Sequence, residues 1–504
     1  MAEVMQAADG TPLKRSLARA PRRQKLRALA LIAPLLIFVL ITFIWPIGAM
    51  LSRSVQNDIV ADTLPETVAV LQAWDGQGMP PDAAFTALYI DLFIAEEQKL
   101  HTRLGTRLNY EMTGASSMFR KTGRAVGRFD TDTYTDAVTD VEPEWEEPTT
   151  WAQVVADHRA DLPLTARSWD RWAAYFASEG DEIEARDLED FLFTALYTDL
   201  QSTVPDAAIL QSAAQALAAV APVDLQAAFA DADEDWANPE IWQTIQLYSP
   251  RVTPGYFLNA VDLEKTPDGV QMKPENEQIL ITLFGRTIWM SLLITFSCIA
   301  LGYPIAWLLA NLPMRQANLL LILVLLPFWT SLLVRTSAWK VMLQQQGVIN
   351  DTLVWIGLVD DANRLIMINN QFGTIVAMTH MLLPFMILPM YSVMQTIPPS
   401  YLRAAKSLGA TNWTAFWRVY FPQSVPGIGA GSILVFILAI GYYITPEIVG
   451  GTKGVFISNR IAYHISSSLN WGLAAALGTI LLVAVLILYW AYDKVVGIDN
   501  VKLG

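Results

Sequence analysis

The sequence contains one cysteine and few charged residues for its length. Only 16% of its 504 residues are charged, whereas soluble domains average about 25%. Cys298 lies within an apolar run, so no disulfide can form within the chain, and we expect this thiol to pack as a small apolar side chain. The shortage of charge excludes an ordinary soluble protein of this size.

Motifs for ATP hydrolysis, metal binding and nucleophilic catalysis are also missing. No G-x-x-x-x-G-K-[ST] run is present; residues 450–456, GGTKGVF, include a lysine but lack the spacing and the preceding strand. The four histidines are scattered, without the spacing of metal ligands, and no Ser/His/Asp arrangement stands out. We therefore expect no catalytic residue, cofactor or metal site, and a chain that is not an enzyme.

The charges that are present divide the chain into two parts. Residues 56–275 contain 39 acidic and 14 basic residues, a net charge of −25, and the remainder contains 9 acidic and 20 basic residues, a net charge of +11. This contrast predicts an acidic, water-soluble insert within a basic, membrane-embedded frame. Because no soluble part presents a basic face, nucleic-acid binding is not expected.

Six apolar stretches are long enough to cross a bilayer, for which about 20 residues suffice. They cover residues 28–52, 287–313, 317–334, 372–394, 429–449 and 471–492. Seven lysines and arginines before residue 28 predict a cytoplasmic N-terminus, and six crossings return the C-terminus to the cytoplasm. The first stretch is longer than the apolar region of a signal peptide, about 7–15 residues, so we expect a retained anchor.

The predicted fold is therefore an all-α polytopic membrane protein with six transmembrane helices and a large, mainly helical, extracytoplasmic insert between the first two. Its predicted parts are a basic cytoplasmic N-terminus (1–27), the first transmembrane helix (28–55), the acidic periplasmic insert (56–275), a core with helices two to six (276–497) and a cytoplasmic tail (498–504). Proline interrupts several spans, as at Pro304, Pro327 and Pro446. Such breaks favour either a bundle around a pathway or simple packing kinks.

The insert contains one internal echo. Residues 85–92, FTALYIDL, and 193–200, FTALYTDL, agree at seven of eight positions. A duplicated helical unit would explain the echo, but the flanks match poorly, and two unrelated amphipathic helices are the preferred interpretation. Residues 140–151, DVEPEWEEPTTW, are predicted to form an acidic linker. The insert serves either as a docking platform for a solute-binding protein or only to keep the domain soluble.

Residues 396–428, here called the inner loop, lie between two apolar stretches on the predicted cytoplasmic side. After two prolines, Ser400 is a candidate N-cap for a short helix that Gly409 ends. A second short helix is expected in TNWTAFWRVYF, with Thr411 or Asn412 as its cap. The prolines of FPQSVP are expected to end this helix before the next span.

The inner loop resembles the EAA loop of ABC importer permeases, whose pattern is Glu-Ala-Ala, three residues, Gly, nine residues, then Ile-x-Leu-Pro. Ala404, Ala405 and Gly409 fit this spacing, and residues 419–422, VYFP, take the place of Ile-x-Leu-Pro. Arg403 stands where the family has Glu, so the charge is reversed at this position. Any salt bridge that the family's Glu makes with the ATP-binding subunit is therefore left open for this chain.

The resemblance implies that the inner loop docks in a groove of a separate ATP-binding subunit and couples ATP hydrolysis to the membrane helices. The residues implied in this contact are Arg403, Ala404, Ala405, Leu408, Gly409, Ala410, Phe416, Pro422 and Pro426. The alternative is an interfacial amphipathic loop without a protein partner.

Two further stretches, 326–350 and 441–451, are similar to segments of spermidine/putrescine-type permeases. The likeness covers the frame, roughly residues 28–55 and 275–497, and nothing specific in 56–275. It implies a type I, binding-protein-dependent importer of polyamines in the bacterial inner membrane. The implied partners are a second permease subunit, a dimer of ATP-binding subunits, a periplasmic solute-binding protein and membrane lipid.

A path for cations needs carboxylates, carbonyl oxygens or aromatic faces. We predict that Glu447 lines such a path, because it is the only carboxylate within the predicted spans. Trp329, Tyr442 and Tyr443 are predicted to supply aromatic faces to the same path. The alternatives are interfacial anchors for the aromatic side chains and a water-facing Glu447. Alternative functions are import of another small solute, such as an anion, iron or an amino acid, and a membrane-anchored sensor with an acidic outer domain.

Overall fold

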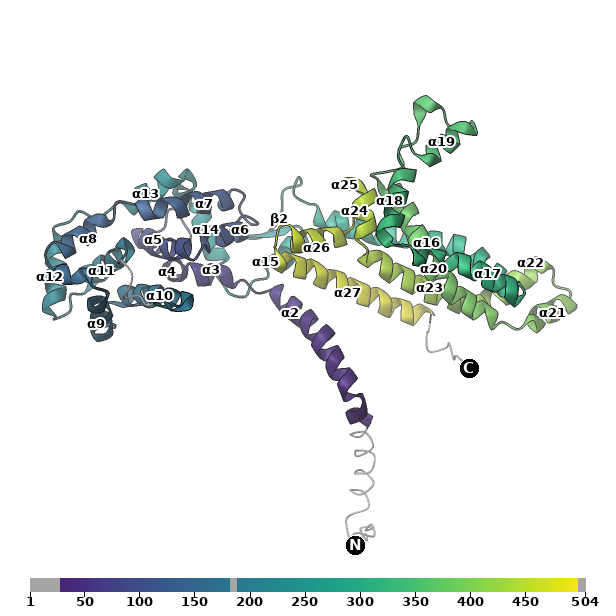
Figure 1. Ribbon diagram of the computed structural model, residues 1–504, viewed down its shortest axis with the longest axis horizontal. Helices are drawn as coiled ribbons and strands as arrows, with labels where there is room; N and C mark the ends of the chain where they lie inside the picture. The colour runs from purple at the N-terminus through teal and green to yellow at the C-terminus, as the bar shows by residue number, and fades with distance from the viewer. Residues whose placement is uncertain (1–27, 182–187, 497–504) are drawn as a thin grey trace, which may run out of the picture.

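The computed structural model describes residues 28–181 and 188–496. Figure 1 shows an elongated molecule with a helical insert at one end and a bundle of long helices at the other. The predicted basic segment 1–27 and the tail 498–504 lie outside the described residues. Within the described part, the chain is helical apart from one two-stranded hairpin.

Five helices in the described part are long and apolar enough to cross a membrane. They are Ala28–Arg53, Leu280–Asn311, Gln371–Gln395, Asn412–Gly441 and Trp471–Tyr492. A sixth span is formed if two helices that meet at 93°, Met314–Trp329 and Leu332–Met342, are counted together. The predicted all-α polytopic architecture is thereby confirmed.

The frame contains further short helices between these spans. The labelled helices of the frame are α2 (Trp45–Arg53), α16 (Leu280–Asn311), α17 (Met314–Leu325), α18 (Leu332–Met342), α19 (Val348–Trp355), α20 (Gln371–Gln395), α21 (Pro399–Ser407), α22 (Asn412–Ala415), α23 (Phe421–Gly441), α24 (Ile444–Val449), α25 (Gly451–Gly454), α26 (Ile457–Ser466) and α27 (Trp471–Val496). Figure 1 shows α16, α20 and α23 running alongside one another, with α21 and α22 beyond one end of the bundle.

Two predicted spans need correction. The stretch 317–334 is not one straight helix, because α17 passes into a 3-10 turn at Leu326–Trp329 and the chain bends before α18. Pro327 lies in this turn and cannot donate a helical hydrogen bond. The stretch 429–449 is also divided: α23 ends at Gly441, and α24 is a separate helix after Tyr442 and Tyr443.

Helices α16, α20 and α23 form the core of the bundle. Their contact is rich in fully buried methionine, an unbranched side chain that fills irregular gaps: Met290, Met378, Met386 and Met390. Cys298 is buried in this contact, with its Sγ 3.6 Å from the carbonyl oxygen of Thr379. The expectation that this thiol packs as a small apolar side chain is therefore confirmed.

The first helix, Ala28–Arg53, stands apart from the bundle. It is continuous through a π-helical turn, η1 (Leu40–Ile44), and none of its most apolar window is buried within the chain. Figure 1 shows it leaving the rest of the molecule, with only its C-terminal end beside α27. At that end the Met50 methyl group lies close to Gly478. The rest of the helix is left to face lipid or another subunit.

The insert is built from short helices. They are α3 (Asp58–Thr63), α4 (Pro65–Leu71), α5 (Asp82–Glu97), α6 (His101–Leu108), α7 (Ala115–Ala125), α8 (Asp132–Thr139), α9 (Pro148–His158), α10 (Pro163–Glu179), α11 (Asp190–Ser202), α12 (Ala208–Ala218), α13 (Leu225–Ala232), α14 (Pro239–Leu247) and α15 (Gly255–Ala260). Proline begins four of them, where its fixed φ suits the first turn and its missing amide is not needed.

The two ends of the insert meet. Gln56 forms an antiparallel bridge with Val252, the amide of Asn57 donates to the carbonyl of Arg251 (2.9 Å), and the Asn57 side chain donates to the carbonyl of Tyr248. A hairpin follows, in which β1 (Leu263–Thr266) pairs antiparallel with β2 (Gly269–Met272), with Leu263 opposite Met272. The chain therefore leaves and rejoins the frame at one place.

The two octapeptides occupy equivalent positions in the insert, in α5 and α11. Asp91 of the first accepts hydrogen bonds from the amide and the hydroxyl of Thr67, both 2.8 Å long. Asp199 of the second accepts the same two bonds from Thr165, again 2.8 Å long. Each threonine is the third residue of a helix that begins with proline. The insert is thus two copies of one unit, α4 to α9 and α10 to α14.

A second pair of anchors supports this duplication. Trp151 donates from Nε1 to the carbonyl of Trp145 (2.9 Å), and Trp242 donates in the same way to Trp236 (3.2 Å). Each donor ring packs edge-on against the phenylalanine that begins the other unit's octapeptide, with centroids 4.9 Å and 4.6 Å apart. The octapeptides therefore occupy equivalent places, which counts against the interpretation as two unrelated helices. In the predicted linker, residues 140–151, Trp145 and Trp151 are buried in the core of the insert, whereas most of the other residues are exposed.

Candidate coupling loop and translocation path

The inner loop is a bent pair of short helices at the end of the bundle, as Figure 1 shows for α21 and α22. The first helix begins with Pro399 at its first turn and Pro398 as the N-cap residue, so Ser400 is inside the helix and the predicted Ser400 cap is wrong. Gly409 follows the helix with φ of +89°, a left-handed conformation that glycine adopts without strain.

The second helix starts where expected and continues further than expected. The Thr411 hydroxyl accepts from the amide of Thr414 at 3.2 Å, which identifies Thr411 as the cap. A π-helical turn, η8 (Phe416–Tyr420), then leads directly into α23. Pro422 falls in the first turn of α23, where no amide donor is required, and Pro426 lies inside α23. The prediction that these prolines end the helix is wrong.

The tip of the inner loop presents apolar side chains away from the bundle. Leu408 is 90% exposed and Trp413 is 72% exposed. Arg403 and Ala404 are exposed on α21, whereas Ala405 and Ala410 are half-buried. An exposed apolar surface of this kind suits either contact with another protein or the membrane interface.

Aromatic contacts connect the inner loop to the membrane helices. The ring of Phe416, half-buried in η8, lies edge-on to Tyr303 of α16, with centroids 6.2 Å apart. The Tyr303 hydroxyl is 3.0 Å from the Ser424 hydroxyl of α23, and Trp417 packs on Phe421 with centroids 4.9 Å apart. These contacts join the loop to both α16 and α23. Tyr303 was not among the predicted residues, because its contacts with Phe416 and Ser424 join segments that are distant in the sequence.

Three of the predicted path residues lie at the break between α23 and α24 or just after it: Tyr442, Tyr443 and Glu447. Asn459 of α26 donates from Nδ2 to the carbonyl of Tyr443 (2.9 Å) and to Oε2 of Glu447 (2.6 Å). Tyr443 and Glu447 are exposed and Tyr442 is half-buried. Glu447 lies in α24, outside the spanning part of α23, so its predicted position within a span is wrong. Asn459 fixes this turn and was missed by sequence reasoning.

Helix α18 contributes residues to the same region. The hydroxyl groups of Thr336 and Thr445, both buried, are 3.2 Å apart and join α18 to α24. Trp339 donates from Nε1 to Nδ1 of His380 at 3.1 Å. Arg335 is half-buried on α18, and its Nε is buried without a hydrogen-bond partner among the described residues. Arg335 was not among the predicted residues, because only the fold brings α18 against α24 and α20.

Trp329 is not part of this group. It ends η6, is 75% exposed, and its ring packs on no other aromatic ring in the described part of the chain. The exposure fits an aromatic side chain at a membrane interface or at a subunit contact. Among the described residues there is also no group of three or more histidine, cysteine, aspartate or glutamate side chains that could hold a metal ion.

Comparison with known proteins places this frame in a family. Residues 280–496 match the family model described as binding-protein-dependent transport system inner membrane component. The chain is 36% identical over 211 residues to the spermidine/putrescine transport system permease protein PotB of Salmonella typhimurium (strain SL1344), covering 41% of this chain and 73% of that protein. It is 32% identical over 234 residues to the inner membrane ABC transporter permease protein YdcU of Escherichia coli (strain K12), covering 44% and 73%.

A solved structure of a bacterial alginate ABC transporter in complex with an alginate-bound periplasmic protein is also similar. Its TM-score is 0.37 at 20% identity, with 45% of this chain and 80% of that chain covered. The family assignment depends on the sequence relatives, of which the chain covers about three quarters. The apolar helices and the matched relatives agree, and the chain belongs to the family of binding-protein-dependent transport system inner membrane components, the permease subunits of ABC importers.

Proposed function

We propose that this permease imports a polyamine and that its inner loop is the surface through which a separate ATP-binding subunit drives transport. The observation that carries the coupling role is the exposed tip, Leu408 and Trp413, joined through Phe416 and Tyr303 to two membrane helices. Exposed apolar groups provide the binding surface, and the packed rings give the stiffness that transmission of a movement requires.

The proposed assembly contains this chain, a second permease subunit, two ATP-binding subunits and a periplasmic solute-binding protein. The first helix supports a further subunit, because its apolar surface is left uncovered by the chain itself. The proposed orientation places both termini and the inner loop in the cytoplasm and the insert in the periplasm. Labelling Leu408→Cys with an impermeant maleimide tests it, since the native Cys298 is buried: labelling is expected only after the cytoplasmic face is opened.

A polyamine is the proposed substrate because relatives that share the frame carry that name. The carboxylate of Glu447, held by Asn459 together with the backbone carbonyl of Tyr443, is the proposed site for an ammonium group. One observation favours a second candidate, an anion: Arg335 lies in the same region with an unpartnered, buried Nε among the described residues. The two candidates differ in which charged residue contacts the solute.

ATP-dependent uptake into proteoliposomes tests both parts of the proposal. The permease is reconstituted with its ATP-binding subunit and solute-binding protein, and uptake of labelled spermidine, putrescine and sulfate is measured. Uptake of the two polyamines, reduced at least tenfold by Glu447→Gln and little affected by Arg335→Gln, is the expected result. Uptake of sulfate alone, with the opposite response of the two variants, would replace the polyamine by an anion.

A further inference from the structure

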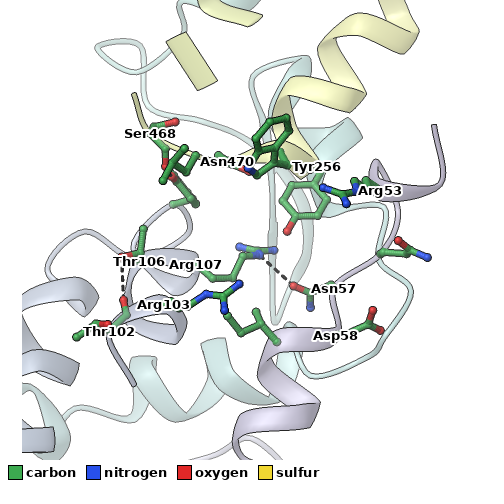
Figure 2. Close-up of a pocket in the computed structure, with 16 residues that line it drawn as sticks. Arg53, Asn57, Asp58, Thr102, Arg103, Thr106, Arg107, Tyr256, Ser468 and Asn470 are labelled. Atoms are coloured by element: carbon green, nitrogen blue, oxygen red, sulfur yellow. Dashed lines mark hydrogen bonds between the residues drawn. The ribbon is translucent and has the colours of Figure 1, made fainter. Parts of the chain in front are cut away.

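A cavity of about 650 Å³ opens where the insert meets the frame, at the end of the bundle opposite the inner loop. Figure 2 shows its walls: the segment after the first span, helix α6, Tyr256 of α15 and the loop that precedes α27. Tyr110 fastens α6 to this loop by donating to the carbonyl of Ser468 at 2.7 Å. Gly472 is required at the wall, because a Cβ there would lie 2.3 Å from Cζ of Tyr256.

Three arginine side chains from two of these walls converge on the cavity. Arg53, Arg103 and Arg107 all line it, and Figure 2 labels them together with Tyr256. No carboxylate in the described part of the chain forms an ion pair with Arg53 or Arg103. Among the described residues, Asp58 is the one acidic residue that lines the cavity. Its Oδ1 lies 3.8 Å from Nη1 of Arg251, and it forms no ion pair with the arginines of the cavity.

Arg107 is the buried member of this group. It is 6% exposed, its Nε donates to Oδ1 of Asn57 at 2.9 Å, and its Nη1 donates to Oε1 of Glu111 at 2.8 Å. Its Nη2 has no hydrogen-bond partner among the described residues. The ring of Tyr256 covers the guanidinium, with Cζ 4.6 Å from the ring centroid. The guanidinium is thereby fixed in position at the wall of the cavity.

A second buried donor lines the same cavity. Asn470, only 5% exposed, has an Nδ2 group without a partner in the described part of the chain, while its Oδ1 accepts from the amide of Leu473 at 3.1 Å. Leaving a buried donor unpaired costs about 1–3 kcal/mol. Two such donors, together with two arginines that have no carboxylate partner, match a ligand that only accepts hydrogen bonds and carries negative charge.

We propose that this cavity binds a phosphate group. A phosphate presents several acceptor oxygens in a geometry that suits the guanidinium fork, which explains the use of arginine rather than lysine. The position favours the headgroup of a phospholipid. Arg53 ends the lipid-facing first span, and Trp471 begins another span. Cζ of Arg53 lies 5.9 Å from the centroid of the Trp471 ring. The volume of about 650 Å³ leaves room for the rest of a headgroup.

The phosphate site is separate from the proposed transport path. Its arginines repel ammonium groups, so a polyamine is not its ligand, and the inference holds whatever solute the permease carries. An occupied site would link α6 of the insert to the loop before α27, in addition to the bond between Tyr110 and Ser468. Lipid would then stabilise the junction between insert and frame.

The experiment uses the full chain, purified in a neutral detergent and depleted of lipid. Its thermal unfolding is followed with added phosphatidylglycerol, with diacylglycerol as an uncharged lipid, and with inorganic phosphate. We expect phosphatidylglycerol but not diacylglycerol to raise the unfolding temperature. The doubly substituted Arg53→Gln, Arg103→Gln chain should need at least about tenfold more phosphatidylglycerol for the same shift. Both side chains are exposed, so their replacement should leave the fold intact.

Arg120→Gln is the matched control, because Arg120 is exposed on α7 and does not line the cavity. It should respond to phosphatidylglycerol like the unmodified chain. A shift with inorganic phosphate at millimolar concentration, also lost in the double variant, would assign the site to a free anion. No shift with either phosphate compound, or equal shifts in the double variant and the control, would overturn the proposal.

Discussion

Gly409 is the residue at which the inner loop reverses direction. Its φ of +89° costs an L-residue about 1–2 kcal/mol, and a β-branched residue more, whereas a Cβ at this position would meet nothing within 4 Å. We therefore expect Gly409→Val to strain the backbone without a steric clash, to displace the exposed tip, and to lower reconstituted uptake at least tenfold. Membrane insertion, measured by fractionation, should be unchanged.

Gly409→Asn is the matched control, because asparagine tolerates the left-handed conformation better than other residues with a side chain. It should keep most of the uptake that Gly409→Val loses. If the valine variant transports at the normal rate, the bend does not matter for coupling. Equal loss in both variants would instead show that the small size of glycine, for close approach of a partner, is what the position needs.

His464 gives the permease a predictable response to acid. Burial and the nearby charge of Arg460 lower the pKa of His464 to about 4, and its Nδ1 lies 2.8 Å from the Ser468 hydroxyl. Because the pKa is lower in the folded than in the unfolded chain, the folded state is favoured above pH 6.5 and loses this advantage as the pH falls toward 4. The loss is on the order of 2 kcal/mol.

Thermal unfolding of the full chain in detergent between pH 7.5 and 4.5 measures this effect. The unfolding temperature should fall below pH 6.5, and His464→Gln should make the fall smaller. A variant that loses stability with the same slope as the unmodified chain would show that other groups cause the acid response.

At the scale of elements, the duplicated unit allows equivalent residues to be compared within one chain. Asp91 and Asp199 accept the same pair of bonds from a threonine, but among the described residues only Asp91 also pairs with an arginine, Arg171, at 2.5 Å. Asp91→Ala should cost about 3–5 kcal/mol, because it leaves a charge unpaired. Asp199→Ala should cost about 1–3 kcal/mol, because it leaves only neutral donors unpaired.

Tryptophan fluorescence during denaturant unfolding of the full chain reports on this difference, since the anchoring tryptophans are buried in the insert. The transition of Asp91→Ala should come at a lower denaturant concentration than that of Asp199→Ala. Equal transitions would mean that the pair with Arg171 contributes no net stability, as occurs when desolvation offsets the attraction between the charges.

The helices of the frame could be located from the sequence because their apolar length fixes them, but their breaks could not. Pro384, Pro389 and Pro426 lie inside helices, whereas Pro327 lies at a bend of 93°. Proline can therefore lie within a helix or mark its end. Which of the two occurs depends on whether neighbouring groups satisfy the backbone carbonyl that proline leaves without a hydrogen bond. The end of α23 at Gly441 depends in this way on Asn459 of another helix, which no local pattern reveals.

The duplication was hidden for a related reason. Equivalent residues of the two units are not separated by one fixed number of residues. The separation is 98 residues for Thr67 and Thr165, 108 for the octapeptides and 91 for Trp145 and Trp236. It varies because the loops and helices between the anchors differ in length. A search at one fixed period finds only the octapeptide. The anchors are equivalent by their hydrogen bonds, which the sequence does not display.

At the scale of the whole molecule, the insert is a separable part of the permease. The segments that lead into and out of its helices are paired: the amide of Thr253 donates to the carbonyl of Val55 at 2.9 Å, next to the bridge between Gln56 and Val252. The family model matches residues 280–496, which follow the insert. Removing residues 58–250 and joining the ends through two glycines should therefore leave the frame folded and able to bind its ATP-binding subunit.

The excised permease tests whether the insert is a docking platform. The insert lies beyond the end of the bundle opposite the inner loop and contains the acidic excess of the chain, so we expect it to contact the solute-binding protein. Excision should weaken binding of that protein at least tenfold, measured by biolayer interferometry on nanodiscs, whereas Gly409→Val should leave it unchanged. Undiminished affinity after excision would remove docking and leave solubility as the role of the acidic surface.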